Sequence, residues 1–474
     1  MVVSHASSDT PPNIVVILAD DMGFGDFGSF NGGINSTPEL DDLAAASLVL
    51  TQHYSASPVC APARAALLTG RYPQRTGVID TLEARGTDRL GLGEVTLADV
   101  LNRHGYRTGI VGKWHSGAVG AAYGPTRRGF DEFTGFRGGW QDYWDWSLEA
   151  DDEGRVTADG RYLTDVLADE AVGFIRRNAA RPFFLHVAFN APHFPFQAPE
   201  ELVARHRAPG RTEVVATIYA MLEIMDRGVG LIRQALADAG LSERTILLFS
   251  SDNGPDHGGV GERSAARFNA GLAGSKQHVY DGGIRVPAIM HWPGVIAPGT
   301  SDRFVHLTDW FPTLLAVAGV PASAGPPLDG HDVSPLLRGE APADVPRFWQ
   351  WTRYRPMRES NAAMRDGRWK LVRPALPGTL DLRPEDELVD IDIKRHPGRY
   401  PDVDDTDAPL HAGPEPPSAR LFDLESDLGE SRDVAADHPD VVARMQAELD
   451  RWFEDVERDR LRGGSAGTAQ EVQR

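Results

Sequence analysis

The chain has 474 residues, 48 of them basic and 68 acidic, and its formal net charge of −20 disfavours nucleic acid as a partner, because such a partner requires a basic footprint. The 41% hydrophobic content is ample for a packed core, yet no stretch approaches the roughly 18 apolar residues of a membrane helix, so we expect no membrane association. The length indicates one large domain plus a smaller one.

The N-terminus and the cysteine content bear on where the protein works. Residues 1–12 contain neither the basic nor the apolar segment of a secretory signal, and we expect them to be disordered. Cys60 is the only cysteine, which excludes an internal disulfide and a four-cysteine zinc site. We therefore expect a cytoplasmic protein, with secretion left open if a signal has been removed.

The first apolar run, residues 13–19, is continuous and rich in β-branched residues, which predicts a strand buried on both faces. Asp20 and Asp21 follow it directly. Two adjacent carboxylates at the end of a buried strand are costly unless a cation lies between them. The alternative is an ordinary polar turn, since the residues after Asp21 also suit a loop.

Three further apolar runs end in polar residues that can take part in chemistry. They are residues 106–112 before Lys113 and His115, residues 182–189 before Asn190 and His193, and residues 245–251 before Asp252 and Asn253. The segments between them, such as 164–177 and 214–239, are long enough for helical crossovers. Because ligands bind at the carboxyl edge of parallel sheets, this order predicts a doubly wound α/β domain over residues 13–345, with its site at that edge.

Cys60 precedes an Ala- and Leu-rich run that predicts a helix. Arg64 lies one helical turn further on and on the same face, and the helix N-terminus adds a positive end of its own. Positive charge from these two sources would hold an anionic substrate next to a nucleophile at position 60. The alternative is a cysteine that packs as a small buried hydrophobic residue.

Residues 60–64, Cys-Ala-Pro-Ala-Arg, resemble the C-x-P-x-R signature of type I sulfatases, arylsulfatase-like members of the alkaline phosphatase superfamily. The resemblance implies that a formylglycine-generating enzyme oxidises Cys60 to Cα-formylglycine. One hydroxyl of the hydrated aldehyde would attack sulfur, and the other would lose a proton to expel sulfate from the covalent intermediate.

Residues 105–115 resemble the second sulfatase signature, G-Y-x-T-x-x-x-G-K-x-H, at every fixed position. The resemblance implies that Lys113 contacts a sulfate oxygen and the aldehyde-derived hydroxyl. It also implies that His115 takes the hydroxyl proton when sulfate is eliminated. The alternatives are a solvated surface lysine and a capping or core histidine.

Two more segments extend the resemblance. His193 resembles the family histidine that assists the leaving group, whereas His186 lies inside an apolar run and is interpreted as a core residue. Lys276 lies in a segment resembling G-x-K-x₄-E-G-G-x-R-V-P and would be a second clamp on the sulfate. Asp281 stands in place of the usual Glu, and we expect it to pair with Arg285.

The charged residues at the strand ends predict a metal site. Asp20, Asp21, Asp252 and Asn253 offer hard oxygen ligands, which suit Ca²⁺ or Mg²⁺ better than zinc. In the sulfatases the matching positions bind one divalent cation, usually calcium, and modified Cys60 would complete its shell. Beside it, the resemblance places three fixed cations around the transition state: Arg64, Lys113 and Lys276.

Residues 140–146 contain three tryptophans and a tyrosine in an expected loop. One interpretation is a wall near the pocket mouth on which a sugar or aryl ring stacks. Packing within the loop is the interpretation we favour.

The character of the chain changes near residue 346. Residues 347–352, 362–372 and 421–427 predict a small antiparallel sheet, and residues 438–456 predict a helix, which together form an α+β subdomain over 346–460. Residues 374–418 form a Pro- and Asp-rich insertion that either approaches the active site, makes a subunit contact or is disordered. We expect a disordered tail over 461–474.

These features predict a sulfatase that hydrolyses a sulfated carbohydrate or aryl sulfate to an alcohol and inorganic sulfate. The first alternative is a phosphodiesterase or phosphonate monoester hydrolase of the same superfamily. The second is a non-catalytic anion-binding protein with unmodified Cys60. The oligomeric state is left open.

Overall fold

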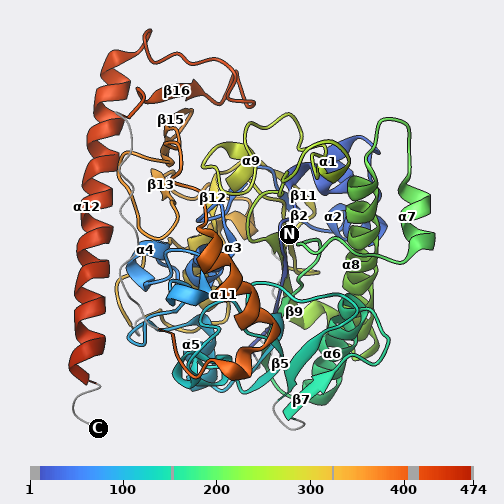
Figure 1. The fold of residues 1–474 in the computed structure, drawn as a ribbon. Coiled ribbons are helices and arrows are strands. Elements are labelled where there is room, and N and C mark those ends of the chain that lie inside the picture. The colour runs from blue at the N-terminus through green and yellow to red at the C-terminus, as the bar shows by residue number, and fades with distance from the viewer. Residues whose placement is uncertain (1–10, 151–153, 323–324, 404–415, 471–474) are drawn as a thin grey trace.

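The computed structural model describes residues 11–150, 154–322, 325–403 and 416–470, and it is built around one ten-stranded sheet (Figure 1). Across the sheet the strands are β11 (Gly299–Ser301), β2 (Leu48–Leu50), β10 (Ala288–His291), β9 (Thr245–Ser251), β1 (Asn13–Ala19), β8 (Phe183–Ala188), β4 (Arg107–Lys113), β5 (Glu132–Phe136), β6 (Ser147–Ala150) and β7 (Gly154–Thr157). The centre, from β9 through β1, β8 and β4 to β5, is parallel, whereas β10 runs antiparallel to β9. The four strands predicted from apolar runs all lie in this centre, so the predicted doubly wound, mostly parallel sheet is confirmed.

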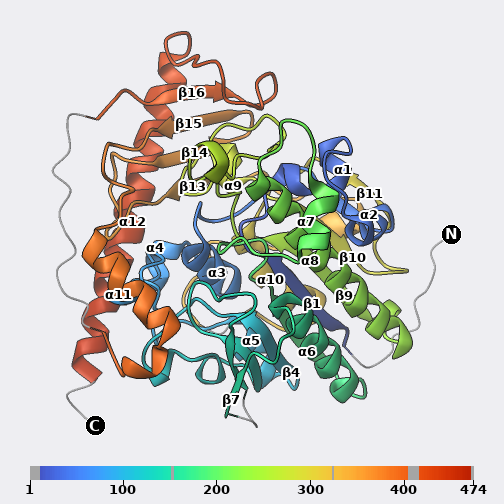
Figure 2. The same ribbon diagram turned by 45° about the vertical axis from the view of Figure 1, so that its right-hand side comes forward.

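Helices cover both faces of the sheet because the side chains of β1 alternate between two hydrophobic cores (Figure 2). Val15 and Ile17 pack with helices on one face, and Ile14, Val16 and Leu18 pack with helices on the other. The first layer holds α2 (Pro38–Ala45), α6 (Leu163–Asn178), α7 (Glu200–His206) and α8 (Glu213–Asp238); the second holds α3 (Cys60–Thr69), α5 (Leu97–Arg103) and α10 (Trp310–Val317). Helices α6 and α8 are the two predicted crossovers.

Short elements connect these layers. The short helices are α1 (Gly28–Asn31), α4 (Pro73–Thr76), α9 (Asp281–Ile284), η1 (Phe24–Asp26), η2 (Glu83–Arg85), η3 (Ala121–Tyr123), η4 (Pro125–Arg127), η5 (Ser242–Arg244), η6 (Gly261–Arg263), η7 (Leu307–Asp309) and η8 (Ser334–Arg338). Strands β3 (His53–Tyr54) and β12 (Val305–His306) form a separate parallel pair. The N-terminal residues expected to be disordered lie outside the described residues up to residue 10, whereas the Pro12 carbonyl accepts a hydrogen bond from Tyr106 Oη at 2.9 Å.

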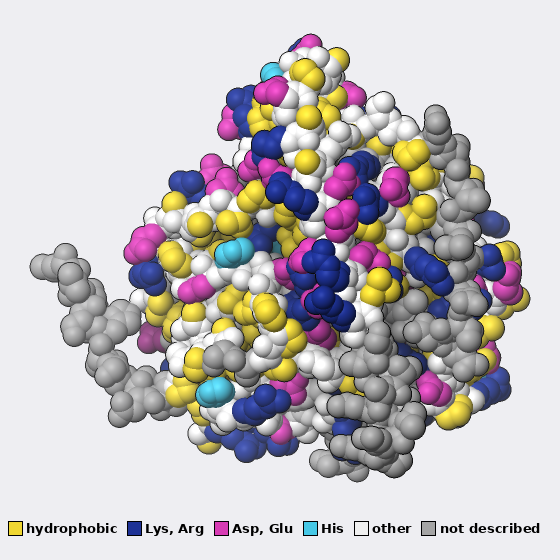
Figure 3. All heavy atoms as spheres, turned by 90° about the vertical axis from the view of Figure 1, so that its left-hand side faces the viewer, with side chains coloured by type: hydrophobic (Ala, Val, Ile, Leu, Met, Phe, Trp, Pro, Cys, Tyr) yellow, Lys and Arg dark blue, Asp and Glu magenta, His cyan; other side chains and the backbone are white. Residues whose placement is uncertain are grey.

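The C-terminal part forms the predicted antiparallel sheet. Its strands are β13 (Arg347–Gln350), β14 (Ala362–Asp366), β15 (Trp369–Arg373) and β16 (Arg420–Asp423), paired in that order. Helix α12 (Pro439–Gln470) packs on this sheet through a stripe that includes Met445, Leu449 and Trp452. Figure 3 shows basic and acidic side chains interspersed over the face that carries this helix.

Helix α12 corrects one prediction, because it continues ten residues beyond Arg460, where we placed the start of a disordered tail. Its second half is held against the catalytic domain by ion pairs: Asp459 pairs with Arg71 and Arg75, and Asp455 also pairs with Arg75. These contacts extend the helix past the apolar stripe from which its end was predicted. Residues 471–474 lie outside the described part. Among the described helices, none is both long and apolar enough to cross a bilayer.

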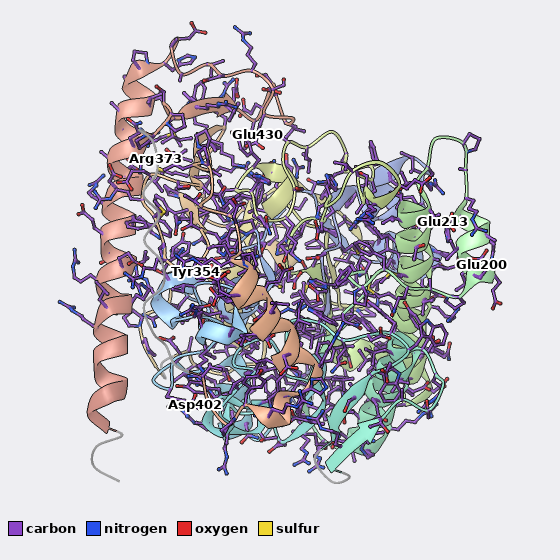
Figure 4. All side chains as sticks on the ribbon, viewed as in Figure 1. Glu200, Glu213, Tyr354, Arg373, Asp402 and Glu430 are labelled. Carbon is purple, nitrogen blue, oxygen red and sulfur yellow. The ribbon has the colours of Figure 1, made fainter. Side chains whose placement is uncertain are left out.

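The insertion between β15 and β16 contains helix α11 (Pro384–Arg395) followed by η9 (Pro397–Arg399). Helix α11 lies across the front of the molecule in Figure 1 and contacts η2 of the catalytic domain. Tyr354, labelled in Figure 4 near this helix, donates to Asp386 Oδ2 at 2.9 Å and accepts from Arg383 N at 2.9 Å. The insertion therefore approaches the active-site side of the sheet, the first of the three predicted possibilities, while residues 404–415 lie outside the described part.

Candidate active site

The carboxyl ends of β1 and β9 bring four oxygen-bearing side chains together. The two strands are parallel neighbours with Ala19 opposite Ser251, so the residues that follow them, Asp20, Asp21, Asp252 and Asn253, meet at one edge of the sheet. Carboxylate oxygens of the three aspartates lie within 4.8 Å of one another, and all four residues are buried. The ordinary-turn alternative for Asp20 and Asp21 is therefore wrong.

This set fits a divalent cation. Asp20 Oδ1 and Asn253 Oδ1 are buried and have no hydrogen-bond partner among the described residues, as expected of acceptors that a cation would satisfy. Burial and the neighbouring Asp20 raise the pKa of Asp252 to about 6. The ligand set contains oxygen atoms only, and a hard cation such as Ca²⁺ or Mg²⁺ would relieve the repulsion among its carboxylates.

Cys60 is the first residue of α3, and its Sγ lies within 4.8 Å of ligand atoms of Asp20 and His193. The thiol is buried, and burial raises its pKa above the ordinary value although Lys113 and Lys276 oppose that effect. A thiol with a raised pKa carries little thiolate at neutral pH and is a poor nucleophile. The position is thus central to the site, but the unmodified side chain is poorly suited to attack.

Arg64 connects helix α3 to the oxygen cluster. Its Nε and Nη2 lie 2.9 and 2.7 Å from Asp252 Oδ2, and Nη1 donates to the Lys113 carbonyl at 3.2 Å. The guanidinium is fully buried, so these contacts hold Asp252 and the end of β4 in fixed positions relative to the helix. Its recorded partners make Arg64 an orienting group at the base of the site.

Two lysines reach the cluster from different segments. Lys113, at the end of β4, places Nζ 2.7 Å from Asp20 Oδ2, and Lys276 places Nζ 2.7 Å from Asp21 Oδ2. Lys113 is fully buried, so the alternative of a solvated surface lysine is wrong. Burial disfavours the charged form of Lys276, but Asp21 and the other acidic groups around it together outweigh burial and raise the pKa of the lysine.

His115 stands two residues beyond β4 in a left-handed backbone conformation, with φ of 49°. Its Nε2 lies 3.2 Å from the Thr81 carbonyl, an acceptor only, so Nε2 carries the proton and Nδ1 bears the lone pair. Within the described part of the chain Nδ1 has no hydrogen-bond partner. Burial and the charge of Lys113 hold the pKa of His115 well below its usual range. The ring is therefore a neutral imidazole with one free basic nitrogen.

His193 follows β8 and, like Lys276, is less enclosed than the other site residues. Its Nδ1 lies 2.6 Å from the Phe194 carbonyl, and its Nε2 lies 3.6 Å from Asp21 Oδ2. Burial and the nearby Lys276 lower the pKa of His193 to about 3. His186, by contrast, is fully enclosed between neighbouring strands, as expected for a core histidine.

The predicted ion pair of Asp281 with Arg285 is present, but two other partners lie closer to the carboxylate. Its carboxylate accepts from Lys370 Nζ and Tyr54 Oη, each at 2.6 Å, whereas the nearest Arg285 nitrogen is 3.8 Å away. Its backbone N–H donates to Glu430, which is labelled in Figure 4 and also pairs with Lys370 at 2.8 Å. This buried network anchors α9, which follows the Lys276 segment, to the small C-terminal sheet.

One supporting pair, Arg267 with Asp26, was not predicted from the sequence. Arg267 donates to the Asp21 carbonyl at 2.6 Å and pairs with Asp26 at 2.7 Å, all three residues being buried. Asp21 has φ of 64°, a strained conformation for a non-glycine residue, and the Arg267 contact helps to hold it. Neither residue belongs to a motif that could have marked it.

The aromatic segment 140–146 divides into two parts. Tyr143 and Trp146 are fully buried, which confirms packing as the role of that part. Trp140 is half-buried and meets Phe194 edge to face, with ring centroids 6.1 Å apart. Phe194 directly follows His193 and is 51% exposed, so an aromatic edge lies beside the histidine.

Comparison with known proteins gives consistent matches over most of the chain. The family model described as Sulfatase matches residues 12–320, and that described as N-sulphoglucosamine sulphohydrolase, C-terminal, matches residues 274–380. The chain is 34% identical to arylsulfatase A of Homo sapiens over 395 residues, covering 76% of this chain and 74% of that protein. It is 35% identical to N-acetylgalactosamine-6-sulfatase of Canis lupus familiaris over 387 residues, covering 73% and 69%.

Solved structures extend the likeness to the whole fold. The crystal structure of Ps i-CgsB in complex with k-i-k-neocarrahexaose superposes with a TM-score of 0.77 at 30% identity, covering 94% of this chain and 93% of that one. Phosphonate monoester hydrolase SpPMH from Silicibacter pomeroyi superposes with a TM-score of 0.64 at 20% identity, covering 94% and 95%, a likeness of fold alone.

Proposed function

The chain belongs to the sulfatase family and is a sulfuric ester hydrolase, and on that premise we propose that it cleaves its sulfate ester through a formylglycine made from Cys60 beside a bound calcium ion. One observation carries the proposal: Cys60 Sγ lies within 4.8 Å of ligand atoms of Asp20 and His193, at the edge where three buried carboxylates gather. A modifiable side chain, a cation site and a histidine therefore share one pocket.

Two groups absent from the polypeptide supply part of the chemistry. Hydrated formylglycine at position 60 would supply one hydroxyl to attack sulfur and a second whose deprotonation would expel sulfate. A divalent cation, when bound, would supply positive charge beside the sulfate group. Asp20, Asp21, Asp252 and Asn253 would hold the cation, and calcium is preferred to magnesium because an all-protein oxygen set suits it better.

Lys113 and Lys276 bind the sulfate group in this proposal. Their ammonium groups flank the oxygen cluster from β4 and from the loop before α9, so an anion entering between them meets fixed positive charge on two sides. The surrounding burial excludes water and strengthens that attraction. Arg64 contributes by holding Asp252, which keeps the cation site and the head of α3 in register.

His115 acts as the proton acceptor. Its Nε2–H is committed to the Thr81 carbonyl, so the only basic atom of the ring is Nδ1, which is buried and unpaired among the described residues. A low pKa keeps the ring neutral, and hence able to accept a proton, over the physiological pH range.

His193 assists the leaving group. Its Nδ1 is held at the Phe194 carbonyl, so Nε2 is the atom available to the ester oxygen. Negative charge arriving with the sulfate ester favours the protonated form and allows Nε2 to donate. The aromatic edge of Trp140 and Phe194 beside it would contact a sugar or aryl ring, which supports a sulfated carbohydrate or aryl sulfate as the substrate.

The two alternatives receive less support. A phosphodiesterase or phosphonate monoester hydrolase shares the fold, but that likeness is at 20% identity, against 34% for an arylsulfatase. A non-catalytic anion-binding protein would have no use for a neutral buried His115 with a free basic nitrogen.

The decisive experiment is a peptide mass for the segment containing Cys60, from protein produced with a formylglycine-generating enzyme. We expect the mass of the aldehyde or its hydrate, together with faster turnover of an aryl sulfate than of the matching aryl phosphate. Cys60→Ala is the control and should be inactive while keeping the fold. An unmodified thiol in an active preparation would refute the formylglycine mechanism, and faster phosphate turnover would favour the phosphohydrolase alternative.

A further inference from the structure

Helix α11, which belongs to the insertion, is docked on η2 immediately beside the catalytic domain's active site. Asp390 of α11 accepts hydrogen bonds from the backbone N–H groups of Glu83 at 2.8 Å and Ala84 at 3.2 Å. Asp386, one turn earlier, pairs with Arg85 at 2.8 Å. A carboxylate of the insertion thus caps the start of η2 and fixes its position.

A buried ion pair lies at the centre of this contact. Lys394 Nζ is 3.2 Å from Glu83 Oε1 and also pairs with Asp390 on its own helix. Glu83 is fully buried, and only 7% of Lys394 is exposed. Glu83 Oε1 also accepts from the backbone N–H of Gly139 at 2.5 Å. The pair therefore joins three segments: η2, the loop after β5, and α11.

These same segments enclose the His115 imidazole. Its Nε2 lies 3.2 Å from the Thr81 carbonyl and 3.9 Å from Glu83 Oε1. A Cβ atom added at Gly139 would lie 2.8 Å from His115 Cε1 and 3.2 Å from Lys394 Cε, so the ring and the lysine stem pack closely on either side of that glycine. Gly139 therefore allows the His115 ring and the Lys394 stem to lie against the same short stretch of backbone.

We propose that Glu83 and Lys394 are positioning residues for His115, so that the insertion supplies part of the active site. The Glu83 carboxyl group lies on the Nε2 side of the ring, 3.9 Å from Nε2, and holds the Lys394 ammonium group beside the imidazole. The charge of Lys394 disfavours the imidazolium and so keeps the ring able to accept a proton at Nδ1. The other charges facing the ring are those of Lys113 and Arg64. The inference rests on the proposed role of His115 as proton acceptor.

A purely structural role explains the pair less well. A buried ion pair is weak evidence for stability, because the desolvation of two charges offsets most of their attraction. An apolar contact between α11 and η2 would hold the insertion equally well. A role in proton transfer explains why the pair lies against His115.

The test compares four variants of the full-length, modified enzyme with an aryl sulfate as substrate. Glu83→Gln keeps an acceptor for Gly139, and Lys394→Met keeps the length of the side chain while removing its charge. Lys394→Arg is the conservative variant. Arg395→Met, the next residue on α11, is exposed and serves as the matched control.

We expect kcat to fall about tenfold or more in Glu83→Gln and Lys394→Met with little change in KM, because a small displacement of a proton acceptor costs turnover rather than binding. The acidic limb of the kcat profile should move to higher pH in Lys394→Met, since the charge of Lys394 lowers the pKa of His115. Lys394→Arg should recover most of the activity, and Arg395→Met should match the parent enzyme.

Unchanged kcat and pH profile in both folded variants would overturn the inference, as would a rise in KM alone, which would make Lys394 a substrate contact. If Lys394→Met fails to fold, Asp390→Asn provides a milder test, because it removes the negative charge of the group that holds η2 and pairs with Lys394. His115→Ala separates this inference from the proposed function. If the parent is active and His115→Ala retains full activity, the proposed role of His115 fails; if His115→Ala is inactive while the positioning variants are normal, only this inference fails.

Discussion

The cation edge of the large sheet and the α11 contact lie on either side of the same pocket, but they are encoded in different ways. At the cation edge, Asp20, Asp21, Asp252 and Asn253 each follow directly on a buried strand, and the parallel pairing of β1 with β9 brings them together. At the α11 contact, Glu83 meets Asp390, which lies 307 residues further along the chain. The first region depends on residues that directly follow two neighbouring strands in the sequence, and the second depends on the docking of a whole segment.

The two regions also differ in how directly their residues take part in the reaction. In the proposed mechanism residues at the cation edge would touch the sulfate or hold the cation, so their loss would remove chemistry outright. Residues at the α11 contact act through His115, so their loss misplaces a group that is still present. We therefore expect effects on activity to decrease from the first region to the second.

The largest effect is expected for Asp252→Asn. It removes one charge from the cation site and the carboxylate that Arg64 holds at 2.9 Å, so kcat/KM should fall by at least about a thousandfold. Chelation of calcium from the parent enzyme should give a comparable loss that added calcium reverses. Bound calcium and activity are measured together, with the exposed Asp238→Asn as the control. Full activity after complete removal of the metal would contradict the cation role.

A smaller loss is expected for Lys276→Met, which belongs to the same region but to a loop and not to a strand end. The lysine pairs with Asp21 at 2.7 Å and is partly exposed, so its removal should leave the fold intact. Loss of one fixed cation beside the sulfate should lower kcat/KM about a hundredfold. Turnover and melting temperature are measured in parallel, and a normal rate would show that Lys113 and the cation suffice.

The next effect concerns the mouth of the pocket. Phe194→Ala removes the exposed ring that follows His193 and meets Trp140, and we expect KM for a carbohydrate or aryl sulfate to rise about three- to tenfold with kcat little changed. Trp144→Ala is the matched control, because Trp144 is an exposed aromatic of the same segment that packs on Tyr162. Equal effects of the two substitutions would remove the argument for a ring-binding edge.

Functional residues could be predicted where they directly follow an element that the local sequence pattern identifies. The strand before Asp20 and the strand before Asp252 could be placed because an uninterrupted apolar run has few alternatives in a parallel sheet. The pairing of Asp281 with Arg285 could also be predicted, but its closer partner Lys370 could not, since Lys370 comes 89 residues later and reaches it only through the register of the small sheet. The course of α12 beyond Val456 was missed for a similar reason: Asp459 pairs there with Arg71 and Arg75 of another domain, which no periodicity reveals.

The smallest effect we expect is on the free energy of unfolding, and it tests whether Glu83 is ionised in the α11 contact. Burial raises the pKa of Glu83 to about 8, although Lys394 opposes the shift. A carboxyl group whose pKa is higher in the folded than in the unfolded state costs stability as it ionises, so this contribution to the free energy of unfolding is lost as pH rises from about 4.5 to about 8. Glu83→Gln cannot ionise and should gain on the parent by about 1 kcal/mol or more over that range. Denaturant unfolding of both proteins at several pH values measures the difference. A constant difference across pH would mean that Glu83 is ionised throughout, and the docking of α11 would then rest on a permanent ion pair with Lys394.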